Sequence, residues 1–340
     1  MTDNHVIIIA EAGVNHNGNY DLAVKMVHEA KAAGADYVKF QTAVPELVIS
    51  SIAPKAEYQK ETTGSGQSQL DMCRAIHLPL SDYAPLKQVC DEAGIGFMST
   101  PFDLVSIDTL EPLDMDYYKI PSGEITNLPY LRKIASKHRR VIMSTGMCEP
   151  DEIGAALDVL LAGGLTLEDI TLLHCNTQYP TPFADVNLLA MNEIGQRFGT
   201  KVGYSDHTVG IEVPIAATAL GATVIEKHFT LDRNLPGPDH KASLMPGELA
   251  EMVRAIRHIE QALGDGRKHV TASEEPNKIV ARKSIVAATD IKKGDLLTDR
   301  NITVKRPGNG ISPMLWDSVI GTRAIADFPA DSLIAIDNDR

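Results

Sequence analysis

A short apolar run, followed by a polar residue and then by apolar residues at helical spacing, recurs along most of this chain. The first run is Val6-Ile7-Ile8-Ile9-Ala10, which is rich in β-branched residues, as expected of a strand buried on both faces. Ala23, Met26, Val27 and Ala30 follow at helical spacing, and Gly34 ends the helix. Alternating strands and helices predict a parallel sheet covered by helices.

The same unit repeats eight times before residue 264. We expect strands at residues 6–10, 36–40, 96–99, 117–120, 141–144, 170–174, 201–204 and 222–225. Helical stretches lie near 82–93, 104–111, 128–137, 150–163, 185–197, 210–219 and 249–263. Eight units in about 265 residues are typical of a (β/α)8 TIM barrel. A doubly wound sheet is the alternative, but the first strand-to-helix turn carries neither a GxGxxG nor a Walker loop.

Two segments depart from this rhythm. Residues 43–80 form a connection far longer than usual, and we expect two short helices in it, near 54–60 and 68–76. We interpret this excursion as a lid or substrate wall rather than a decorative subdomain. The predicted barrel spans residues 1–264. The polar stretch 265–281 that follows is typical of a linker, and the pattern of residues 282–340 predicts a small, loop-rich β domain.

Composition excludes several classes of function. The 340 residues carry a net charge of −13 and no basic run, which argues against a nucleic-acid partner. No segment approaches the roughly 18 apolar residues of a membrane span. The 4 cysteines show no CxxC spacing, so we expect neither a zinc site nor a disulfide framework, and we expect a cytoplasmic location.

The residues that end the predicted strands are almost all polar. In a barrel such residues converge on one pocket. They are Glu11, Lys39, Gln41, Thr100, Lys119, Ser122, Glu124, Ser144, Thr145, Asn176, Ser205, His207 and His228. Lysines among hydroxyls favour a small anion carrying phosphate or carboxylate. The sequence therefore predicts an active site at the barrel mouth rather than a non-catalytic sugar-binding or ice-binding protein.

His207 and His228 follow two consecutive strands. Such a pair suits a divalent metal that polarises a carbonyl, although histidines at a barrel rim also serve only as hydrogen-bonding groups. Glu124 and Glu11 are candidates for a general base. A Schiff-base aldolase using Lys39 or Lys119 is the competing chemistry, but the surrounding carboxylates and hydroxyls oppose the neutral lysine that it needs.

Longer motifs carry a resemblance that covers essentially the whole chain. They are residues 10–18 (AEAGVNHNG), 38–42 (VKFQT), 99–103 (STPFD), 119–124 (KIPSGE), 144–147 (STGM), 173–177 (LHCNT), 179–182 (YPTP), 203–208 (GYSDHT), 226–230 (EKHFT), 237–240 (GPDH) and 305–311 (KRPGNGI). With these motifs the chain resembles the bacterial sialic acid synthases, which condense phosphoenolpyruvate with an N-acylated mannosamine.

The resemblance implies a TIM barrel followed by an antifreeze-like (SAF) domain, in a domain-swapped homodimer. It implies that His207 and His228 hold Mn2+ or Mg2+ and that Glu124 is the base. We count Glu11 and Lys119 with Glu124 as the catalytic candidates. The implied phosphoenolpyruvate-binding residues are Lys39, Thr100, Lys119, Ser122, Ser144 and Ser205. The implied sugar-binding residues are Glu11, Gln41, Tyr179 and Asp239, with Arg306 contributed by the partner chain. Asn176 is a further candidate for binding substrate.

The sugar is less well defined by these motifs, because they are shared by enzymes that make different nonulosonic acids. We rank N-acetylneuraminate first among the products. Legionaminate, made from a 2,4-diacetamido-2,4,6-trideoxymannose, is the close alternative, and pseudaminate is more distant. The discriminating contacts are expected in the 43–80 segment.

Overall fold

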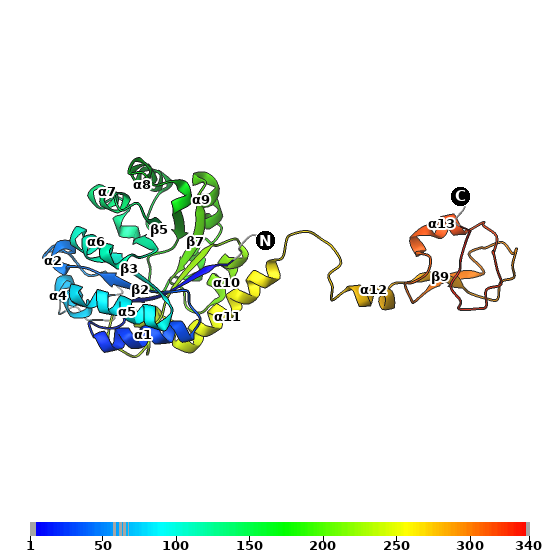
Figure 1. Cartoon of the computed structure of the whole chain (residues 1–340), viewed down its shortest axis with the longest axis horizontal. Helices are drawn as coiled ribbons and strands as arrows, with labels where there is room; N and C mark the ends of the chain where they lie inside the picture. The colour runs from blue at the N-terminus through cyan, green and yellow to red at the C-terminus, as the bar shows by residue number, and fades with distance from the viewer. Residues whose placement is uncertain (1–4, 57–58, 61–62, 64–65, 67, 338–340) are drawn as a thin grey trace. The chain divides into compact units, whose positions relative to one another are not determined.

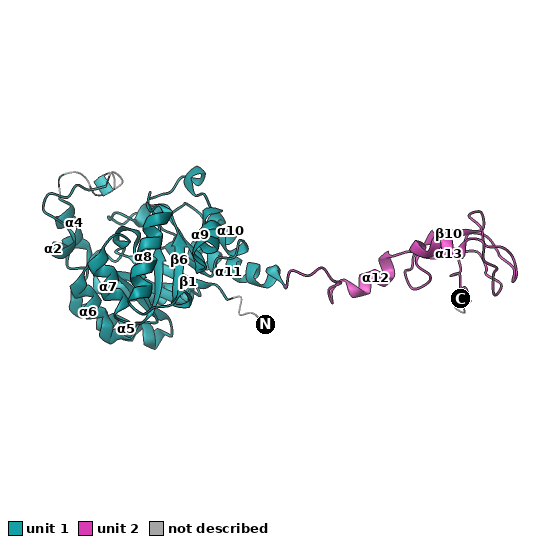
Figure 2. Cartoon of the chain, turned by 90° about the horizontal axis from the view of Figure 1, so that it is seen from above, with its two compact units in different colours: residues 1–264 teal, residues 265–340 magenta. Residues whose placement is uncertain are grey.

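The computed structural model describes residues 5–56, 59–60, 63, 66 and 68–337. The chain divides into two compact units, residues 1–264 and 265–340, which are coloured separately in Figure 2. Each unit has a hydrophobic core of its own. Each is therefore described by itself.

Unit 1 is a barrel of parallel strands, as Figure 1 shows. The strands are β1 (Ile7–Gly13), β2 (Tyr37–Thr42), β3 (Gly96–Pro101), β4 (Tyr117–Ile120), β5 (Arg140–Ser144), β6 (Ile170–His174), β7 (Lys201–Asp206) and β8 (Val224–His228). Their order in the sheet is β3-β2-β1-β8-β7-β6-β5-β4, so that β1 pairs with both β2 and β8. The predicted barrel is confirmed.

Helices cover the outside of the sheet. They are α1 (Tyr20–Ala32), α5 (Tyr83–Ala93), α6 (Leu104–Leu110), α7 (Leu128–Ala135), α8 (Pro150–Ala162), α9 (Ala190–Phe198), α10 (Glu212–Ala219) and α11 (Pro246–Leu263). Asn19 begins α1 by accepting a hydrogen bond from Leu22 N at 3.0 Å. The helix expected from residue 185 begins only at Ala190, because Asn187 adopts a left-handed conformation (φ 46°) that interrupts it.

The barrel interior has an apolar floor. Ile9, Met98, Tyr117, Ile142, Leu173 and Val224 form a buried cluster, one residue from each of six strands. On β7 the equivalent position is Gly203, where a Cβ atom would lie only 2.2 Å from the carbonyl oxygen of Val224. A side chain at this position is excluded by that approach of neighbouring backbone. The floor fixes which face of every strand points inward.

The 43–80 excursion contains α2 (Pro45–Val48) and α4 (Gln69–Ile76). Ser68 begins α4 by accepting a hydrogen bond from Asp71 N at 3.1 Å, where the sequence predicts a helix at 68–76. The helix predicted near 54–60 falls partly outside the described residues. Residues 59 and 60 are helical and residues 54–56 are not.

Unit 2 contains α12 (Glu275–Ala281), the antiparallel strands β9 (Ser284–Ala287) and β10 (Ile302–Lys305), and α13 (Trp316–Val319). Its core includes Ile285, Leu297, Ile302, Val319 and Ile334. The stretch predicted as a linker thus ends in a short helix, α12. In the part of the chain that the structure describes, no helix is both long and apolar enough to cross a membrane.

Candidate active site

The active-site candidates follow from the apolar floor by strand periodicity. Side chains two residues apart on a strand point to the same side, so each floor residue is followed by a second inward-facing one. This second layer has polar side chains on seven strands and Cys175 directly after β6. It consists of Glu11, Lys39, Thr100, Lys119, Ser144, Cys175, Ser205 and Glu226. Six of the positions two residues further on also line the cavity, and these are Gln41, Phe102, Pro121, Thr177, His207 and His228.

These residues line one cavity of about 280 Å³. Tyr179, Asp239 and Ser122 also reach it from the loops that follow the strands. The excursion contributes Met72, Cys73, Ile76 and His77 to the same wall. The sequence-predicted residues Glu11, Lys39, Gln41, Thr100, Lys119, Ser122, Ser144, Tyr179, Ser205, His207, His228 and Asp239 therefore lie together.

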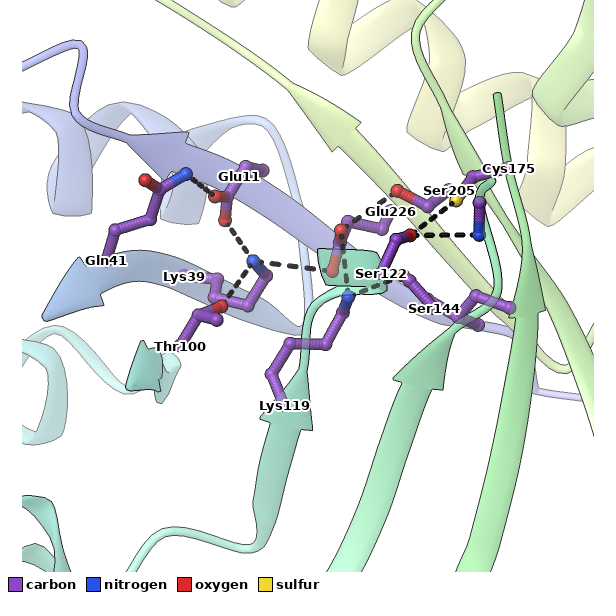
Figure 3. Close-up of polar contacts among 12 residues, drawn as sticks. Glu11, Lys39, Gln41, Thr100, Lys119, Ser122, Ser144, Cys175, Ser205 and Glu226 are labelled. Carbon is purple, nitrogen blue, oxygen red and sulfur yellow. Dashed lines mark hydrogen bonds and ion pairs between the residues drawn. The ribbon is translucent and has the colours of Figure 1, made fainter. Parts of the chain in front are cut away.

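Charged side chains at the bottom of the cavity form one network, shown in Figure 3. Nζ of Lys39 lies 2.7 Å from Oε2 of Glu11 and donates to Thr100 Oγ1 at 3.0 Å. Glu226 lies between the two lysines, with Oε2 3.5 Å from Nζ of Lys39 and Oε1 3.6 Å from Nζ of Lys119. Lys119 also donates to Ser144 Oγ at 2.6 Å. All of these side chains are buried.

The two carboxylates differ in pKa. Burial raises the pKa of Glu11 to about 7, despite the opposing charge of Lys39. Burial also disfavours the charged form of Glu226, but Lys119 and Lys39 outweigh it and lower the pKa of Glu226 to about 2. Glu226 is therefore a permanent anion between two cations, whereas Glu11 can exchange a proton near neutral pH.

Hydroxyl groups continue the network toward β5 and β7. Ser205 Oγ donates to Oε1 of Glu226 at 2.9 Å. Ser122 Oγ accepts a hydrogen bond from Gly146 N at 2.9 Å and lies 3.4 Å from Cys175 Sγ. Together with the lysines, these donors offer several hydrogen bonds to an anion that carries both phosphate and carboxylate.

The two histidines lie at the rim of the same cavity, with ring centroids 5.5 Å apart. His207 uses Nδ1 to donate to the carbonyl oxygen of Asn176, so in the neutral ring Nε2 is an acceptor, here for the hydroxyl of Tyr179 at 2.9 Å. Nδ1 of His228 is buried without a hydrogen-bond partner. Burial lowers the pKa of His207 to about 4 and the pKa of His228 well below its usual value, so both rings are neutral.

This arrangement fits a metal ion. A ligating histidine commonly donates its other ring N–H to a backbone carbonyl, as His207 does, and the free Nδ1 of His228 supplies a second lone pair. No group of three or more His, Cys, Asp and Glu side chains suited to a metal occurs among the described residues. A metal here would thus have two protein ligands, with the remaining positions open to water and substrate oxygens.

Three sequence-predicted residues of unit 1, Glu124, Thr145 and Asn176, are not among those that line the cavity. Thr145 Oγ1 donates to the carbonyl oxygen of Leu173 at 3.0 Å. Glu124 is half-buried beside it and accepts a hydrogen bond from Asn127 Nδ2 at 2.6 Å. Asn176 uses its side chain within its own loop, accepting from Gln178 N at 2.8 Å, and only its carbonyl oxygen serves the site. Arg306 belongs to unit 2, where its Nε donates to the carbonyl oxygen of Ala281 at 3.1 Å.

Sequence reasoning missed Glu226, because it considered the polar residues that end each strand. Glu226 precedes the end of β8, and only the alternation Val224, Glu226, His228 shows that it faces inward. The same alternation sends Lys227 outward, where it forms a fully buried ion pair with Asp206 and donates to the carbonyl oxygen of Thr208 at 2.6 Å. This pair joins the ends of β7 and β8, directly beside His207 and His228 in the sequence.

Comparison with known proteins gives this barrel a family. Residues 26–268 match the NeuB family, and residues 282–338 match the SAF domain. The chain belongs to the NeuB family. The SAF match also confirms the small C-terminal domain predicted from the resemblance.

Individual relatives span nearly the whole chain. The N,N'-diacetyllegionaminic acid synthase of Campylobacter jejuni subsp. jejuni is 51% identical over 96% of this NeuB-family chain and 98% of its own length. The synthase of the same name from Legionella pneumophila is 44% identical over 96% of this chain and 92% of its own. The crystal structure of an N-acetylneuraminic acid synthetase from Leptospira borgpetersenii matches with a TM-score of 0.70 at 33% identity, covering 80% of this chain and 90% of the other.

Proposed function

We propose that this chain is a phosphoenolpyruvate-dependent synthase that makes N,N'-diacetyllegionaminate from 2,4-diacetamido-2,4,6-trideoxymannose. The observation that carries the proposal is its 51% identity to a legionaminic acid synthase over 96% of this chain and 98% of that one. The two buried lysines at the bottom of the cavity, Lys39 and Lys119, suit the phosphoenolpyruvate that these enzymes share as a substrate. The reaction forms one carbon–carbon bond, adds water and releases inorganic phosphate.

The bottom of the cavity is the proposed phosphoenolpyruvate site. Lys39 and Lys119 face it from β2 and β4, and Thr100, Ser122, Ser144 and Ser205 surround them. Buried ammonium groups bind phosphate and carboxylate strongly because little water competes with them. The enol carbon is then held below the rim, where it can meet an aldehyde carbon placed near the histidines.

The rim is the proposed sugar site, with Gln41, Tyr179, Asp239 and Glu11 on its walls. His207 and His228 would hold Mn2+ or Mg2+, which supplies a Lewis acid for the aldehyde oxygen. After the carbon–carbon bond forms, water adds to C2 and phosphate leaves from the tetrahedral centre. Glu11 is the base favoured by the geometry, since its carboxylate lines the cavity and its pKa is about 7.

Glu124 is the base that the resemblance implies, and it stays a second candidate. Its carboxylate does not line the cavity among the described residues, and it is engaged by Asn127. For Glu124 to act on water at C2, the turn that carries it would have to move toward the lysines. The present geometry does not require such a movement for Glu11.

The proposed product differs from the one that the sequence motifs ranked first. N-acetylneuraminate stood first there, but the relatives at 51% and 44% identity are both legionaminic acid synthases, whereas the N-acetylneuraminic acid synthetase structure is only 33% identical. The cavity supports a sugar without phosphate, because the lysines among its described lining residues, Lys39 and Lys119, lie at the bottom and not at the rim. The wall from the excursion carries Met72 and Ile76, which suit a deoxy sugar.

We infer further that the enzyme acts as a homodimer in which Arg306 of one chain serves the sugar site of the other. This assembly rests on the resemblance to sialic acid synthases. It gives a role to Arg306 in the segment 305–311 (KRPGNGI), one of the motifs that carry the resemblance.

Phosphate release tests the proposed function. Purified enzyme given phosphoenolpyruvate and Mn2+ should release phosphate only when the diacetamido sugar is added, and a chelator should stop the release until Mn2+ is restored. Release that persists after complete removal of the metal would contradict the metal assignment. Borohydride trapping of a pyruvate adduct on a lysine would instead support the aldolase alternative.

A further inference from the structure

A second, smaller hollow of about 170 Å³ opens beside the active-site cavity. The two share Gln41, Cys73, His77 and Phe102, so these four side chains form a common border. Beyond the border the hollow is walled by Ala43, Pro45, Val48, Ile49 and Gln69, all from the excursion after β2. We call it the side pocket. Its location makes it an extension of the substrate site rather than an isolated surface feature.

We propose that the side pocket receives the 4-acetamido group of the sugar and thereby selects a 2,4-diacetamido substrate over a sugar with a 4-hydroxyl group. This inference rests on the proposed function and adds to it the residues that choose the substrate. The pocket offers both kinds of contact that an acetamido group needs, apolar surface for its methyl group and hydrogen bonds for its amide. Val48, Ile49 and Phe102 offer apolar surface for a methyl group, and Gln41 and Gln69 offer amide hydrogen bonds.

His77 adds a directed acceptor at the border. Its Nδ1 lies 2.9 Å from the carbonyl oxygen of Cys73, which can only accept, so Nδ1 carries the proton. In the neutral ring Nε2 is therefore an acceptor, suited to an amide N–H. A lone methyl group, such as C6 of the deoxy sugar, would use the apolar wall but leave these polar groups without a substrate partner.

The order of the strands around the rim places the side pocket away from the histidines, on the side where C4 of the sugar is expected. His207 directly follows β7 and His228 is the last residue of β8, and β1 lies between β8 and β2. Glu11 on β1 accepts a hydrogen bond from Nε2 of Gln41 at 3.2 Å, and Gln41 is part of the border. A chain of carbons that starts at the histidines and runs past Glu11 thus brings C4 toward the side pocket.

Filling the pocket tests the proposal. Ile49→Phe places a ring in the hollow. Leu47→Phe, two residues earlier in α2, is the matched control because Leu47 is exposed and lines neither cavity. The substrates are 2,4-diacetamido-2,4,6-trideoxymannose and 2-acetamido-2,6-dideoxymannose, which differ only at C4. We expect Ile49→Phe to lower the ratio of their kcat/KM values by about tenfold or more, and Leu47→Phe to leave it as in the wild type.

The outcomes separate the two proposals. If the wild type turns over the diacetamido sugar but Ile49→Phe leaves the ratio unchanged, the side pocket is not the 4-acetamido site, and the proposed function stands. If the wild type does not turn over the diacetamido sugar, both proposals are overturned. Val48→Phe is a second filling variant, in case Ile49→Phe does not fold, and the same ratio decides its result.

Discussion

Glu226 lies with Oε1 3.6 Å from Nζ of Lys119, and both side chains are almost completely buried. The same carboxylate reaches Lys39 with its other oxygen at 3.5 Å. One anion thus holds two ammonium groups that would otherwise repel each other in a medium of low dielectric constant. The site is assembled around this carboxylate before any substrate binds.

Glu226→Gln should lower the free energy of unfolding by about 3 kcal/mol, because it leaves two buried cations with too little negative charge. Inorganic phosphate should restore part of that loss in the variant, since it supplies the missing charge. Urea unfolding with and without phosphate measures both effects. Glu111→Gln, which removes an exposed partner of Lys137, is the control and should cost about 1 kcal/mol or less. Equal losses in the two variants would contradict the network.

Asp239→Asn should stabilise the folded protein at pH 7.5. Burial raises the pKa of Asp239 to about 6, above its unfolded value, so the folded state binds a proton more tightly. Ionising this group therefore costs stability above pH 6, by about 2–3 kcal/mol, and costs nothing below pH 4. Thermal unfolding of variant and wild type across this range should show a difference that grows as pH rises. A difference independent of pH would contradict the burial effect.

Glu11→Gln should lower kcat about a hundredfold or more, because it removes the favoured base while keeping the shape of the side chain. Glu124→Gln should lower kcat far less, since its carboxylate is bound to Asn127. Steady-state phosphate release for both variants, with circular dichroism to check folding, gives the comparison. A larger loss in Glu124→Gln would assign the base to Glu124.

His228→Ala should fold normally, because Nδ1 of His228 makes no hydrogen bond that the substitution would break. It should bind Mn2+ at least about tenfold more weakly, as followed by the electron paramagnetic resonance of free Mn2+. His28→Ala, an exposed position on α1, serves as the control and should bind as the wild type does. Full Mn2+ binding by His228→Ala would refute the ligand assignment.

Mixing Arg306→Ala with Lys119→Gln should restore activity that neither variant has alone. If unit 2 of one chain completes the barrel of the other, each mixed dimer contains one intact site. Random exchange would then recover up to about a quarter of wild-type activity. Activity that never exceeds the sum of the separate variants would contradict the domain swap.

Strand periodicity carries most of what the sequence predicts here. Buried β-branched runs and their polar ends predict the barrel and place Lys39, Lys119 and His207 in one cavity, as the structure does. Glu226 lies in the same layer as Lys39 and Lys119, and it was missed because His228, two residues further on, was taken as the residue that ends its strand. The start of α9 was misplaced because the left-handed conformation of Asn187 depends on its surroundings rather than on local pattern.

The role of the 43–80 excursion could not be predicted from the sequence, for a different reason. Its helices are short, and what decides their role is contact with residues far away in sequence, such as Phe102 after β3. No periodic pattern encodes such contacts. Glu124 was also mispredicted from a motif. The motif predicts that Glu124 lies in the active site, whereas in the structure its carboxylate accepts a hydrogen bond from Asn127.

A direct competition between sugars tests the central claim. The enzyme receives phosphoenolpyruvate, Mn2+ and equal concentrations of 2,4-diacetamido-2,4,6-trideoxymannose and N-acetylmannosamine, and mass spectrometry quantifies the two nonulosonic acids formed. We predict that N,N'-diacetyllegionaminate exceeds N-acetylneuraminate by about tenfold or more. A product mixture dominated by N-acetylneuraminate would contradict the account.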